Sequence, residues 1–203
     1  SINILIGQNN TNTPYSLYGL GVENKTASGG LTGLGNTGIA QSNPFEINLF
    51  NPASLAGILQ NSFLYEFGLN GTYSTLKTQN IRETSSTGNI SHIAIAFPIK
   101  KDWGISVGLL PYTKTGYNID IESSIEGSTD MYLTRITGIG GLNKFYVSSG
   151  LKMFNNLSFG VDVSFLFGSI EQESHLYSDS FFSITDQNYY GGVKLKTGLQ
   201  YKL

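Results

Sequence analysis

The chain has 203 residues, a formal net charge of −2 and no cysteine. The missing cysteines exclude disulfides, Cys-ligated zinc and thiol nucleophiles, and the near-neutral charge gives no electrostatic basis for binding nucleic acid. Asp, Glu, Lys and Arg make up only 13% of the residues, whereas Gly (25), Tyr (12) and Phe (12) are abundant. This composition favours β-structure, and so little charge predicts that something other than water covers the apolar surface.

Residues 1–8 form a short apolar run that ends in small and polar residues. Such a run is typical of the end of a signal-peptide core, although an extended N-terminal arm explains it equally well. We therefore leave residues 1–8 out of the fold prediction.

Residues 9–60 form a second segment, which ends in the apolar stretch NLFNPASLAGI at 48–58. Pro52 fixes its own φ and pushes Asn51 into an extended conformation. The small residues Ala53 and Gly57 allow close packing, and Leu55 offers an apolar contact. Taken alone, these residues predict a capped helical turn before a strand.

From residue 61 onward, apolar and polar side chains alternate with period two, which predicts strands with one apolar face. Six strands are expected, at 61–78, 89–99, 103–122, 131–153, 157–170 and 188–203. Most are much longer than the usual five or six residues. Short turns at 100–102 and 154–156 alternate with long polar connections at 78–89, 123–130 and 171–188. The fold class is therefore predicted to be all-β, as a transmembrane antiparallel up-and-down β-barrel.

The alternation also assigns side chains to the two faces of this barrel. The polar members of the strands are expected to face the lumen: Glu66, His92, Asp120, Lys144, Asp162 and Lys194. Aromatic side chains at strand ends are expected to lie at the membrane interface, where amphipathic rings prefer to sit: Trp103, Phe154 and Tyr201.

An unclosed sheet of six strands would leave two open edges, and their unpaired backbone groups would face lipid at a prohibitive cost in free energy. Bacterial barrels begin at about eight strands. We therefore expect either that residues 61–203 are part of a larger barrel, which we favour, or that other polypeptide segments complete the wall.

Three stretches in order, TPYSLYGLG (Thr13–Gly21), GGLTGLGNTGIA (Gly29–Ala40) and NPASLAG (Asn51–Gly57), precede an aromatic strand. Together they resemble the FadL/TodX-like outer-membrane proteins, nearest the branch that includes outer-membrane subunits of type IX secretion. The resemblance implies a barrel of about 14 strands, with residues 61–203 as its N-terminal part and residues 9–60 as an N-terminal hatch in its lumen. The implied hatch residues are Asn51, Pro52, Ala53, Leu55 and Gly57.

Pro111 lies in the middle of the third predicted strand, where it removes a ladder hydrogen bond and bends the strand. The fourth predicted strand carries a glycine cluster, Gly138, Gly140 and Gly141. The resemblance implies that such a kink opens a lateral hole in the wall. The alternative is a bulge that only shapes the barrel.

The resemblance implies passive, porin-like transport of hydrophobic small molecules through a hatch-gated lumen with a lateral exit near Pro111. The alternative is a non-enzymatic subunit that docks on or plugs a type IX secretion translocon. The implied partners are outer-membrane lipids, a hydrophobic small-molecule ligand or a large translocon barrel. The implied location is the outer membrane of a Gram-negative cell, as an integral membrane protein.

We expect no cofactor, no metal site and no catalytic residue. Only two histidines are present, His92 and His175, too few for a histidine-rich metal site. Ser91, His92 and Asp162 could be imagined as a hydrolytic set. However, adjacent residues of a regular strand point to opposite faces, so Ser91 and His92 are not expected to cooperate.

Overall fold

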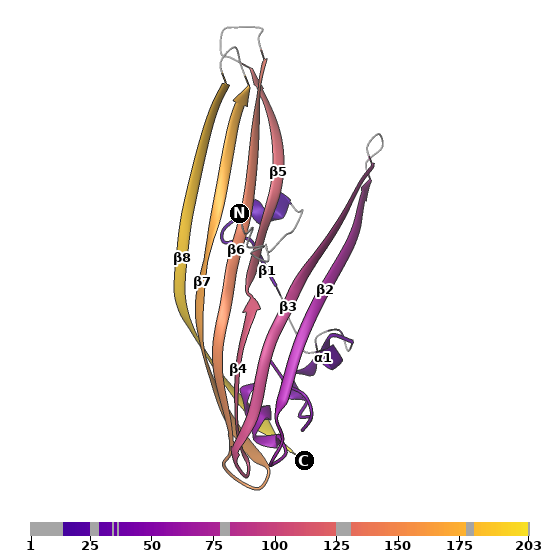
Figure 1. Ribbon diagram of the computed structural model, residues 1–203, viewed down its shortest axis with the longest axis vertical. Coiled ribbons are helices and arrows are strands. Elements are labelled where there is room, and N and C mark those ends of the chain that lie inside the picture. Colours follow the sequence, from indigo (N-terminus) through magenta and orange to yellow (C-terminus); the bar gives the residue numbers. More distant parts are fainter. Residues whose placement is uncertain are drawn as a thin grey trace, which may run out of the picture.

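The computed structural model describes residues 14–24, 29–33, 35, 37–77, 82–124, 131–177 and 181–202. Eight strands of this part of the chain form one antiparallel sheet that does not close (Figure 1). They are β1 (Val22–Glu23), β2 (Leu64–Lys77), β3 (Arg82–Lys100), β4 (Trp103–Pro111), β5 (Thr113–Ser124), β6 (Met131–Lys152), β7 (Leu157–Tyr177) and β8 (Phe181–Tyr201). The all-β antiparallel prediction is confirmed. The expected signal-peptide remnant, residues 1–8, lies outside the described residues.

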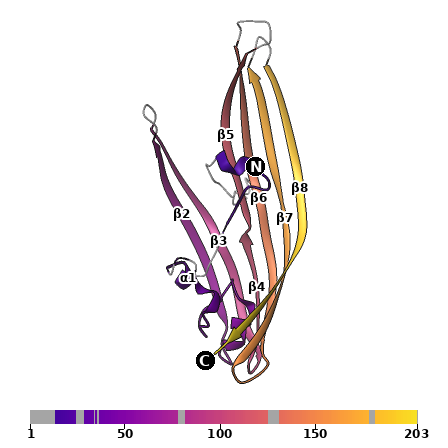
Figure 2. The ribbon, with the colours of Figure 1, turned by 180° about the vertical axis from the view of Figure 1, so that it is seen from behind.

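In the described ranges, four short helical segments accompany the sheet: η1 (Pro14–Leu17), α1 (Gly29–Gly33), η2 (Gly38–Ala40) and η3 (Pro52–Gly57). No helix in the described ranges has the length and apolarity needed to cross a membrane. Figures 1 and 2 show α1 and its neighbouring segments near one end of the sheet, and η1 higher, beside β5 and β6.

The sheet runs β2–β3–β4 on one side and β6–β7–β8 on the other. β4 and β5 share one edge of β6: β4 pairs with residues 143–151 and β5 with residues 131–140. The expected third strand is therefore broken in two at Tyr112. Two expected polar connections are also corrected, because residues 82–89 belong to β3 and most of 171–188 belongs to β7 and β8.

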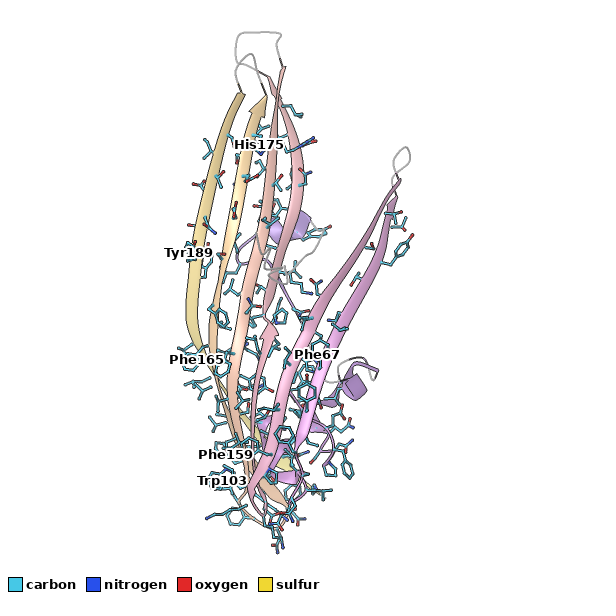
Figure 3. All side chains as sticks on the ribbon, viewed as in Figure 1. Phe67, Trp103, Phe159, Phe165, His175 and Tyr189 are labelled. Carbon is cyan, nitrogen blue, oxygen red and sulfur yellow. The ribbon has the colours of Figure 1, made fainter. Side chains whose placement is uncertain are left out.

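The two faces of the sheet differ sharply. The inner face is defined here as the face that carries η3. Near the short turns, η3 covers this face. The outer face exposes large apolar side chains along β2, β3, β6, β7 and β8 (Figure 3). They include Tyr65, Phe67, Phe97, Phe145, Val147, Phe159, Phe165, Phe167, Val193, Leu195 and Leu199. Farther from the short turns the outer face becomes polar, as Arg135 and Asp120 show with an ion pair of 2.7 Å.

A row of four glycines crosses the inner face beneath η3. Gly104 of β4 pairs with Gly150 of β6, Gly150 with Gly160 of β7, and Gly160 with Gly198 of β8. We call these four residues the glycine row. Because none of them has a side chain, the backbone of η3 can approach the sheet closely.

The contacts at the glycine row leave no space for a Cβ atom. A Cβ on Gly104 would overlap the Leu55 carbonyl, and one on Gly160 would overlap the backbone of Pro52 and Ala53. Every residue from Pro52 to Ala56 is buried as a result. The core lies between this turn and the sheet and consists of Ile47, Leu55, Ile58, Ala94, Ala96, Leu110 and Tyr146.

Substituting Gly160 by Ala is expected to destabilise the protein by about 1–3 kcal/mol, the usual cost of overpacking a tight core. Gly192→Ala on the neighbouring strand is the matched control, since a Cβ at Gly192 meets nothing within 4 Å. Thermal unfolding of both variants in detergent measures the difference. Equal melting temperatures would contradict the close packing of η3 on the glycine row.

Candidate functional site

Asn51 fastens the buried turn at its start. It is extended (φ −128°, ψ 107°), as expected for a residue that precedes proline. Its Oδ1 accepts a hydrogen bond of 3.0 Å from the Ala53 N–H, which caps η3. Its Nδ2 donates 3.1 Å bonds to the carbonyls of Ile39 and Leu199. One side chain therefore ties the turn to the preceding segment and to β8.

β8 supplies two further anchors. Lys196 Nζ donates a 2.7 Å bond to the Leu49 carbonyl, and Gln200 Nε2 donates a 2.9 Å bond to the Ala40 carbonyl. The segment before the long strands is thus held through its backbone carbonyls. The five residues of the hatch prediction, Asn51, Pro52, Ala53, Leu55 and Gly57, all lie in or next to this anchored turn.

Glu66 of β2 anchors the other side of the segment. Its Oε1 accepts a 2.7 Å bond from the Ile47 N–H, and its Oε2 lies 3.3 Å from His92 Nε2. The other ring nitrogen of His92 lies 3.2 Å from Ser91 Oγ. Ser91, His92 and Glu66 therefore form one chain of contacts that ends on the backbone of the segment.

The expectation that Ser91 and His92 point to opposite faces was wrong. His92 pairs with Gly68 and Ile90 pairs with Leu69, which leaves Ser91 as the extra residue of a β-bulge. A bulge interrupts the alternation of side chains, so both side chains are buried on the same face. A polar pocket of about 580 Å³ lies beside them.

Asp162 is buried on the inner face between two serines. Ser148 Oγ and Ser164 Oγ donate bonds of 2.5 Å and 2.6 Å to its two carboxylate oxygens. Lys144 Nζ lies 5.6 Å from the centre of the Tyr146 ring, and Lys194 Nζ lies 3.4 Å from the Tyr112 hydroxyl oxygen. Lys144, Asp162 and Lys194 thus share the inner face. Among the described residues, no three His, Asp or Glu side chains gather as metal ligands would.

Asp120, expected in the lumen, lies on the outer face. It pairs with Arg135, and Arg135 pairs with His175. His175 and Asp162 are an odd number of residues apart on the regular strand β7, so they occupy opposite faces. The break at Tyr112 causes this inversion, and it turns Tyr117 inward, where its hydroxyl bonds Gln172 Oε1 at 3.0 Å.

The aromatic residues expected at a membrane interface lie near the short turns. Trp103 begins β4, and its Nε1 donates a 2.9 Å bond to Ser149 Oγ (Figure 3). Phe154 lies in the turn between β6 and β7, and Tyr201 pairs with Leu157 at the start of β7. Phe154 and Tyr201 are mostly exposed.

Pro111 marks the place where the wall divides. Pairing of β3 with β4 ends at Ile93 and Leu109, and proline has no N–H with which to continue it. The Pro111 carbonyl instead accepts a 3.2 Å bond from Asn24 Nδ2. Beyond this level β3 and β5 diverge, as both ribbon views show (Figures 1 and 2). We call the space between β3 and β5 the fork.

The glycines named with Pro111 lie at the same level on β6. Gly138 and Gly140 pair with Tyr117 and Thr115 of β5, and Pro111 itself pairs with Asn143. Gly140 and Gly141 have φ values of 135° and 146°, which side chains rarely adopt.

At the base of the fork lies a pocket of about 630 Å³, with mostly apolar walls that include Leu69, Ile90, Ile93, Leu109, Leu110 and Pro111.

Two features of the site were missed by the sequence analysis. The glycine row was visible only as separate small residues, because nothing local shows that four glycines fall in one register. The bulge at Ser91 left no signal beyond Gly68 on the facing strand. Both depend on how β-strands pair, which the alternation pattern alone does not determine.

Comparisons with known proteins overturn the resemblance inferred from the motifs. A family model described as BamG matches residues 1–203. No curated protein and no solved structure matches the chain. BamG is a different family from the FadL/TodX-like proteins, so the assignment to that family was wrong.

The functions that followed from the resemblance fall with it. These are the passive transport of hydrophobic molecules and the docking on a type IX secretion translocon. The implied partners, namely outer-membrane lipids, a hydrophobic ligand and a translocon barrel, lose their support as well.

The match leaves no part of the chain uncovered, from the segment anchored on the glycine row to the last strand. An all-β sheet with an apolar outer face is consistent with a place at the outer membrane. Because one family model spans all 203 residues, the protein belongs to the BamG family and is associated with the outer membrane.

Proposed function

We propose that the protein is a non-enzymatic subunit of the BAM complex, which acts in outer-membrane biogenesis, and that it is integral to the membrane. Membership of the BamG family is the observation that carries this proposal. The subunit supplies a wall and surfaces for partners in that complex. The chemistry of insertion is left to other components.

The outer face supports a membrane-spanning position. On β7 the apolar outward residues run from Leu157 to Phe167, ten steps of about 3.3 Å, or about 33 Å along the strand. A strand tilt of about 40° reduces this to about 25 Å, the height of the apolar band on outer-membrane barrels. Trp103, Phe154 and Tyr201 lie at the short-turn end of the band, where an interfacial girdle is expected.

The open edges support completion of the sheet by further strands. Within the described residues, β2 and β8 each pair on one side only, and lipid cannot satisfy an unpaired strand edge. A closed barrel formed with additional strands removes both edges. In that barrel residues 9–60 contribute a hatch in the lumen, with η3 seated on the glycine row.

Placing Arg at Val163, near the middle of the apolar band, is expected to cost about 2–4 kcal/mol and to reduce membrane assembly. Thr185→Arg is the control, because Thr185 pairs with Glu173 on the same face but beyond the band. Heat-modifiable migration of the full-length protein from isolated outer membranes measures the folded fraction. Equal folded fractions for the two variants would argue against a membrane-spanning position.

Affinity-tagged full-length protein, solubilised from native outer membranes, is expected to co-purify with the central barrel of the BAM complex in a stoichiometric amount. A tagged outer-membrane barrel of similar abundance and no known assembly role is the control. Quantitative mass spectrometry of both eluates provides the measurement. BAM components at the control level would refute the proposed function.

The Ser91, His92 and Glu66 contacts are proposed to hold the segment and not to catalyse a reaction. Glu66 already accepts the Ile47 N–H, and Ser91 and His92 are both about 95% buried. A fluorophosphonate probe is therefore expected to label the wild-type protein no more than Ser91→Ala. Labelling that disappears in Ser91→Ala would overturn the non-enzymatic assignment.

A further inference from the structure

The edge of β5 that faces the fork carries backbone groups available for pairing. Ser16 Oγ accepts the Gly116 N–H at 3.0 Å and donates to the Gly116 carbonyl at 3.1 Å. Both backbone groups of Gly116 therefore point away from β6. Alternate residues of a strand share this direction, so the backbone groups of Asn118 and Asp120 also face the fork. No strand of the described residues pairs with them there.

The chain itself shows that this edge accepts an antiparallel partner. β1 pairs with it at Thr113 and Lys114, and the Asn24 N–H donates a 2.8 Å bond to the Tyr112 carbonyl. At Gly116 the Ser16 hydroxyl takes the place of a paired strand, because it bonds both the N–H and the carbonyl of that residue. Among the described residues this cover extends no farther than Ser16, because η1 turns at Pro14–Leu17.

The chemistry of the fork selects a polypeptide as its occupant. Alternating N–H and C=O groups on β5 are matched by another strand, in the way that extended segments add to exposed sheet edges. The apolar pocket lies at the base of the fork, where Ile90, Ile93 and Leu109 line it. An apolar small molecule would fill the pocket but leave the β5 edge unpaired.

We propose that an extended segment of a BAM partner adds to β5 in the fork, antiparallel to residues 117–124. The proposal rests on the proposed function only for the source of that segment. β1 and Ser16 mark the place where the added strand ends, because an antiparallel partner runs toward Gly116.

Photo-crosslinking in cells tests the register. A photoreactive amino acid is placed at Asn118 or at Asp120 in the full-length protein, and at Val147 as the control, since Val147 pairs on both sides. We expect Asn118 and Asp120 to crosslink to one partner polypeptide. The attachment point should move about two residues toward the partner's N-terminus from Asn118 to Asp120, as antiparallel pairing requires.

Three outcomes would overturn the proposal. They are attachment to residues 1–13 of the same chain, attachment to lipid alone, and protein crosslinks without this register. The control position Val147 should give no crosslink to a partner polypeptide.

A backbone substitution provides a second test. Asn118→Pro removes the N–H that faces the fork, whereas Asn118→Ala removes the same side chain and keeps that N–H. With the photoreactive amino acid at Asp120, losing one hydrogen bond is expected to lower recovery of the crosslinked partner about fivefold in Asn118→Pro relative to Asn118→Ala. Equal recovery, with both variants folded in the outer membrane, would exclude pairing at Asn118.

The two proposals fail separately. If BAM components do not co-purify but another protein crosslinks in antiparallel register, the proposed function is wrong and the docking site stands. If BAM components co-purify equally with Asn118→Pro and Asn118→Ala, and Asn118 gives no crosslink in register, the proposed function stands and the docking site is wrong.

Discussion

The close approach of one short turn to four aligned glycines is the contact on which the rest of the structure depends. The glycine row lets the backbone of Pro52–Gly57 lie against β4, β6, β7 and β8 without an intervening side chain. The core forms around that contact. Asn51 and Lys196 then join the turn to β8, and Glu66 joins the preceding segment to β2. Strands far apart in the sheet are thus held by one segment.

Two irregularities in the strands redistribute side chains between the faces. The bulge at Ser91 brings Ser91 and His92 together on the inner face. The break at Tyr112 turns Asp120 outward and Tyr117 inward, and it separates β3 from β5. Beyond such a point, the side chains that a continuous alternation would assign to one face of the sheet lie on the opposite face. The same break produces the fork, where the facing edge of β5 pairs with no described strand beyond Lys114, and an unpaired strand edge is a liability unless it is covered or used.

The family assignment shows how far a motif can mislead. Asn51-Pro52-Ala53 and the glycine-rich stretches are explained here by local physics. Asn51 caps a turn, Pro52 starts it, and small residues allow it to pack against a sheet. Any chain that seats a turn on a β-wall meets these requirements, so the motif reports packing more directly than function. The match over the whole length to BamG therefore outweighs the resemblance of three short stretches.

The sequence by itself determined the approximate positions of the long strands, the antiparallel all-β class, the apolar face and the extended Asn51 before Pro52, because these follow from local periodicity and from the fixed φ of proline. It also located the interruption at Pro111, because a missing N–H is local. Only the tertiary structure decided which glycines share a row, that Ser91 bulges beside His92, and that Asp120 faces outward. Those features are set by strand register, and register depends on partners that lie tens of residues away.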